Sequence, residues 1–166
     1  EAGVDTIDHG TFLDDEAIRL FKAKGAYLVP TMIAPITALA QARAGALPAN
    51  TIPKAEAAAA SAMTSHSKAI AAGVKIAFGT DTGVSKHGEN AQEFALLVKA
   101  GMTPAAAIRA ATVSAADALG RDDIGAITPG KRADIIAVSG SPLEDVTRLE
   151  KVAFVMHHGV VARAAQ

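Results

Sequence analysis

The first thirty residues predict a strand, a helix and a second strand joined by short connections. Val4 to Asp8 is a short β-type run. The segment Leu13 to Glu16 then places carboxylates where the N-terminus of a helix favours them, and Gly25 follows as a C-terminal stop. Tyr27 to Thr31 is a second β-type run. Strand, helix and strand in this order are typical of a parallel α/β unit.

The following ninety or so residues continue this alternation. Prolines at 30, 35, 48 and 53 indicate a loop excursion with some helix. The alanine-rich stretch Lys54 to Ala72 predicts a helix, and Val74 to Phe78 a third strand. Asn90 with Glu93 resembles a capping box ahead of a helix from Ala91 to Lys99. Thr103 and Pro104 then open a helix that runs to Gly120.

The pattern changes after residue 120. The segments 124–127 and 133–138 predict two strands around a Pro-Gly turn, and the segments 152–157 and 160–162 predict a second hairpin. A small β region thus follows an α/β region. We expect two parts, residues 1–120 and residues 121–166.

Composition excludes several classes of partner and site. Sixteen Lys and Arg against 17 Asp and Glu, with no basic run, argue against nucleic acid or an anionic membrane as a partner. No apolar run approaches the roughly 20 residues that a membrane span needs. The chain has no Cys, so a metal would have to bind to His and carboxylate side chains.

Two of these side chains stand at the ends of predicted strands. His9 ends the first strand, and Asp81 follows the third in Gly79-Thr80-Asp81-Thr82-Gly83. Barrel enzymes keep their chemistry at this end of their strands, and imidazole is a common metal ligand. The residues alone also allow the plainer interpretations, a packed His and an Asp that caps its own turn.

The other histidines carry weaker signals. His87 lies in the loop after Asp81, where it would reach a bound substrate or would be an ordinary exposed side chain. We expect His66, in the alanine-rich helix, to lie at the surface. We expect His157 and His158, beside the last hairpin turn, to be structural.

The motifs together resemble the amidohydrolase superfamily. The resemblance rests on the segment around Ile7-Asp8-His9-Gly10-Thr11, the segment around Asp81, and Gly125 to Ile136, which fits G-x-I-x-P-G-K-x-A-D-I. It is nearest to the imidazolonepropionase-like and prolidase-like members and covers the chain to about residue 163. It implies the C-terminal part of a (β/α)8 barrel, about strands 6 to 8, followed by strands of a small β-sandwich.

The resemblance also implies roles for three residues. His9 corresponds to a metal ligand on the sixth strand. Asp81 corresponds to the metal ligand and proton-transfer group on the eighth. His87 corresponds to a loop position near the substrate. The implied cofactor is a divalent metal, with zinc favoured and one or two ions in the full-length protein.

The activity expected from the resemblance is hydrolysis of an amide C–N bond in a dipeptide-like or N-acyl amino acid substrate. Two alternatives stay open: a cyclic-amide hydrolase or aminohydrolase of the same superfamily, and a non-catalytic half completed by another chain. The family's remaining ligands would precede Glu1. We therefore expect the 166 residues to need an N-terminal barrel half as partner, and alone to be inactive and to bind metal weakly. Compartment and homo-oligomeric state stay open.

Overall fold

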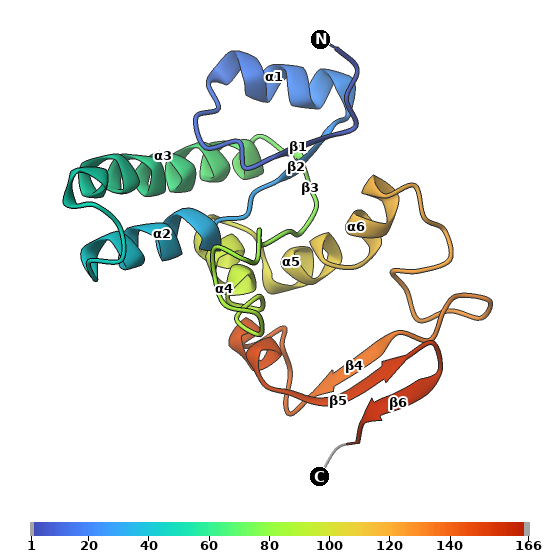
Figure 1. Ribbon diagram of the computed structural model, residues 1–166. Coiled ribbons are helices and arrows are strands. Elements are labelled where there is room, and N and C mark those ends of the chain that lie inside the picture. Colours follow the sequence, from blue (N-terminus) through green and yellow to red (C-terminus); the bar gives the residue numbers. More distant parts are fainter. Residues whose placement is uncertain (1, 165–166) are drawn as a thin grey trace.

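The computed structural model describes residues 2–164 and contains two separate sheets (Figure 1). The first sheet is parallel, with strands in the order β1 (Thr6–Asp8), β2 (Tyr27–Val29) and β3 (Lys75–Ile76). The second is antiparallel, in the order β4 (Ile135–Val138), β5 (Val152–His157) and β6 (Val160–Arg163). The predicted α/β class is confirmed.

Helices connect these strands and separate the two sheets. The α-helices are α1 (Asp15–Lys24), α2 (Ile33–Arg43), α3 (Ile52–Ala71), α4 (Gln92–Lys99), α5 (Pro104–Ala110) and α6 (Val113–Ala118). Two 3-10 turns, η1 (Ala49–Thr51) and η2 (Val146–Glu150), complete the elements. None of the helices formed by residues 2–164 is both long enough and apolar enough to cross a bilayer.

The parallel sheet follows from its connections. Parallel neighbours need a crossover, and α1 supplies it between β1 and β2, while α2 and α3 supply it between β2 and β3. Helix α1 begins where predicted, since Asp14 Oδ1 accepts the backbone N–H of Ala17 at 2.8 Å. It ends at Gly25, whose φ of 66° a side chain would disfavour. Because the strands are parallel and adjacent, their C-terminal ends lie at one edge.

The core is centred on β2, the middle strand. Leu28 is fully buried there, between the apolar faces of α1, α3, α4 and α5. The buried cluster consists of Ile18, Phe21, Ala26, Leu28, Met32, Ala69, Val74, Ile76, Leu97, Ala100, Ala107 and Ala110. Strand β1 is less covered than β2 and β3, because Ile7 in the strand is 41% exposed and Val4, just before it, is 52% exposed.

Two predicted elements are wrong. The expected helix from residue 104 to 119 divides into α5 and α6, because the Ala110 carbonyl accepts the N–H of Phe78 at 3.0 Å instead of continuing the helix. The segment 124–127 forms no strand. It packs on α6 so closely that a Cβ on Gly125 would lie 2.8 Å from the Cβ of Ala116. The last predicted hairpin is confirmed as β5 and β6.

Candidate metal centre

The three strands of the parallel sheet lead into three residues with an unusual backbone. His9 follows β1 directly, Thr31 follows β2, and Asp81 lies in the loop after β3. Their φ angles are 68°, 50° and 51°. They are three of the four non-glycine residues with positive φ in residues 2–164. Such a conformation costs about 1–2 kcal/mol per residue and is concentrated at functional sites, so this edge of the sheet is the place to look for one.

His9 has one ring nitrogen engaged and one available. Its side chain is exposed, and Nδ1 lies 2.7 Å from Thr31 Oγ1. In the tautomer suited to metal binding, Nδ1–H donates to this hydroxyl and Nε2 carries the lone pair. A hydrogen bond to the other ring nitrogen is how metal-binding histidines are oriented. Thr31 therefore fits as the orienting partner of His9.

Helix α3 holds the loop that carries His9. His66 Nε2 lies 2.5 Å from the backbone oxygen of His9, and Ser65 Oγ lies 2.9 Å from that of Thr11. The prediction that His66 is a surface residue is wrong, since the side chain is 1% exposed. Burial lowers the pKa of His66, and the bond to the His9 carbonyl partly offsets that effect. A neutral, buried imidazole thus fixes the backbone of the candidate ligand.

Asp81 is exposed, and its loop is held from the start of α4. Asn90 Nδ2 donates to Thr80 Oγ1 at 3.0 Å and also to Thr82 Oγ1, the hydroxyls on either side of Asp81. Asn90 Oδ1 accepts the N–H of Gly88 at 3.2 Å. The predicted capping box is therefore wrong, because the Asn90 side chain binds the Asp81 loop instead of its own helix.

Glu93 is the site residue that the sequence prediction missed. It is fully buried, and its carboxylate accepts the backbone N–H groups of Met32 at 2.9 Å and Ile33 at 2.8 Å. It therefore caps α2, the helix that begins just after Thr31. Burial raises the pKa of Glu93 to about 7, against the opposing effect of these two hydrogen bonds. No local sequence pattern marked this contact, because Glu93 lies 60 positions after Ile33, the first residue of α2, and the N-cap Met32 offers no capping side chain.

The structure does not assign a function to His87. The residue is exposed in the loop between Asp81 and Asn90. No hydrogen bond or ion pair found among the described residues joins it to His9 or Asp81. It stays a predicted substrate contact.

The donor set at this edge has two members. His9 and Asp81 belong to no group of three or more clustered metal-capable side chains within residues 2–164. Their strands are separated by β2. An imidazole and a carboxylate are suitable zinc ligands, but a catalytic zinc needs about three from protein. His9 and Asp81 can therefore supply two ligands of a metal ion, and at least one further ligand is needed.

A comparison with known protein families decides the relationship. The sequence profile of the amidohydrolase family matches residues 1–162. The chain belongs to the amidohydrolase family. The resemblance noted above to imidazolonepropionase-like and prolidase-like members is confirmed by individual relatives of this amidohydrolase chain.

Ochratoxinase from Aspergillus niger is 36% identical over 160 residues, which cover 95% of this chain and 33% of the relative. Imidazolonepropionase from Cutibacterium acnes is 31% identical over 142 residues, 84% of this chain and 31% of the relative. A crystal structure of a Xaa-Pro dipeptidase with bound methionine matches with a TM-score of 0.93 and 42% identity, over 98% of this chain and 41% of that one. The amidohydrolase chain thus spans about a third of the length of these curated relatives.

Proposed function

We propose that these residues form part of the active site of a metal-dependent amidohydrolase that cleaves the C–N bond of a dipeptide-like or N-acyl amino acid substrate. The observation that carries the proposal is the placement of His9 and Asp81. Both follow strands of one parallel sheet at the same edge, both have left-handed backbone, and both stand in a chain of the amidohydrolase family.

In this proposal, His9 Nε2 and the Asp81 carboxylate are ligands of a divalent metal, with zinc favoured. When bound, such an ion lowers the pKa of a water molecule to about 7 and polarises the substrate carbonyl. Asp81 accepts a proton as water attacks the amide carbon and returns it to the leaving nitrogen. Thr31 holds the His9 ring, and His87 contacts the substrate from the loop after Asp81. Further ligands come from outside this chain, in the same protein or a partner.

The relatives support this substrate class unevenly. The Xaa-Pro dipeptidase structure, which has the higher identity, favours a dipeptide-like substrate. The imidazolonepropionase relative supports the second candidate, a cyclic-amide hydrolase or aminohydrolase that acts on a heterocycle. The attack of a metal-activated water proposed for His9 and Asp81 is common to both candidates, which differ in the substrate and in the C–N bond that is hydrolysed.

The test is an assay of the natural gene product that contains this chain, on dipeptides, N-acyl amino acids and heterocyclic amides, with zinc supplied. Asp81→Asn should lower kcat at least about a hundredfold, because a positioned general acid or base contributes that much. Asp122→Asn removes an exposed carboxylate elsewhere and should change little. Full activity of the Asp81→Asn variant would refute the proposed role. Absence of turnover on every substrate would favour the non-catalytic alternative.

A further inference from the structure

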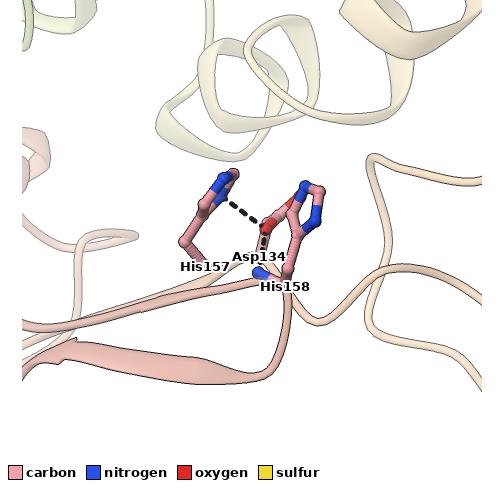
Figure 2. Close-up of side chains that lie close together, drawn as sticks. All are labelled: Asp134, His157 and His158. Carbon is pink, nitrogen blue, oxygen red and sulfur yellow. Dashed lines mark hydrogen bonds and ion pairs between the residues drawn. The ribbon is translucent and has the colours of Figure 1, made fainter.

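Three metal-capable side chains gather at the turn between β5 and β6, on the second sheet (Figure 2). Asp134 lies just before β4, His157 is the last residue of β5, and His158 is in the turn. One donor atom from each lies within 4.8 Å of the others, and the two imidazole centroids are 4.1 Å apart. Among residues 2–164, this hairpin cluster of Asp134, His157 and His158 is the one such group.

Backbone contacts hold the hairpin cluster in place. Asp134 Oδ1 accepts the backbone N–H of His158 at 2.7 Å and lies 2.9 Å from His157 Nδ1. The N–H of Gly159 donates to the Ala133 carbonyl at 3.0 Å. His158 itself has a φ of 49°. The left-handed turn and the start of β4 are thus tied together, because the Asp134 carboxylate contacts both the His157 imidazole and the backbone N–H of His158, as Figure 2 shows.

We propose that the hairpin cluster binds one divalent transition-metal ion of the zinc or nickel class, separate from the His9 and Asp81 site. Imidazole nitrogens and a carboxylate oxygen are the donors that suit these ions. The ion takes the place of the proton that His157 Nδ1 shares with Asp134 Oδ1. The side chains are exposed, so water completes the coordination. The bound ion fastens the β5–β6 turn to the start of β4.

Arg132 opposes binding in a way that can be measured. Its Nη1 lies 3.1 Å from His158 Nε2, and a guanidinium only donates, so this Nε2 is an acceptor with a lone pair. An ion at that nitrogen must displace Arg132 and its charge. Arg132 has an alternative partner, because its Nε already pairs with Asp123 Oδ2 at 2.7 Å. Removing the guanidinium should therefore strengthen binding.

The experiment is a zinc titration of the 166-residue chain by calorimetry, with one ion per chain expected at the hairpin cluster; the weak binding expected of the chain alone concerns the incomplete ligand set of His9 and Asp81. Asp134→Asn keeps an oxygen that can accept the His158 N–H but removes the negative charge. Asp134→Asn and His157→Ala should each weaken zinc binding at least about tenfold. Arg132→Gln should tighten binding severalfold. The double variant His9→Ala/Asp81→Asn should bind as the parent does, which separates this site from the one in the proposed function. Asp122→Asn removes an exposed carboxylate outside the hairpin cluster and is the matched control for Asp134→Asn.

A second measurement uses the unsubstituted chain alone. Zinc should shift the imidazole NMR signals of His157 and His158 at the same midpoint as the calorimetric titration, while those of His66 stay in place. The proposal is overturned if the chain binds no zinc, if Asp134→Asn and His157→Ala bind as the parent does, or if zinc leaves the His157 and His158 signals unmoved.

Discussion

The buried imidazole of His66 lies 2.5 Å from the backbone oxygen of His9, 57 positions earlier in the chain. Helix α3 is thereby bonded to the residue that carries the candidate metal ligand. Ser65, the preceding residue, bonds the carbonyls of Gly10 and Thr11. The left-handed backbone at His9 is therefore maintained by side chains from a separate helix, and that arrangement can be tested.

Replacing His66 with Ala should destabilise the chain by about 1–3 kcal/mol, because the His9 carbonyl loses its partner beside a new cavity. The loss should be measured by urea unfolding. Amide hydrogen exchange at residues 9–11 should also accelerate more than in the rest of the first sheet. His87→Ala, in an exposed loop, should change stability by less than about 0.5 kcal/mol. Equal stability of the two variants would contradict the role given to His66.

Glu93 should make stability depend on pH. Burial raises its pKa to about 7 in the folded chain, from an ordinary value of 4.5, so the folded state binds the proton more tightly than the unfolded state. The stability due to this proton is present below pH 4.5 and is lost as pH rises through about 7. At roughly 1.4 kcal/mol per pKa unit, the loss is about 3–4 kcal/mol.

Unfolding of Glu93→Gln across this pH range should show a flatter profile than the parent. Glu144→Gln removes an exposed carboxyl instead and serves as the matched control. A profile that Glu93→Gln leaves unaltered would be inconsistent with a protonatable buried cap.

The sequence correctly predicted those features whose interacting residues lie close together in the chain. Asp14 and Thr103 cap helices through N–H groups three residues on, and β5 and β6 join through a short turn. Glu93 bonds residues 60 and 61 positions away, so its capping-box spacing with Asn90 was misleading.

His66 was misplaced because its helix is mostly alanine. Ala62 and Ala69 lie on its buried face, yet alanine occurs on both faces of α3, so periodicity did not mark the inside. From sequence, His9 could be placed at the end of a strand and Asp81 after one, although Asp81 lies in the loop that follows β3. Their left-handed backbone and the side chains that hold it could not, because both depend on packing between distant segments.

Gly79 should be intolerant of a side chain for steric reasons. A Cβ there would lie 2.3 Å from Val29 Cγ1 on the neighbouring strand, a distance no real contact allows. Gly79→Ala should therefore destabilise the chain by about 1–3 kcal/mol in urea unfolding. Val29→Ala removes the clashing methyl, so the double variant should be more stable than the sum of the two single effects predicts. Simple additivity would show that the clash is relieved in some other way.

Thr31 should affect metal binding through one hydrogen bond. Its Oγ1 lies 2.7 Å from His9 Nδ1, and Thr31→Val removes that hydroxyl while keeping a branched side chain of the same shape. Loss of an orienting partner typically lowers metal affinity about 10–100-fold. We expect a loss of this size in zinc affinity for the natural gene product, measured by competition with a chelator. Thr31→Ser keeps the hydroxyl and should retain most of the affinity. Parent-like affinity in Thr31→Val would mean that Thr31 does not orient His9 for the metal.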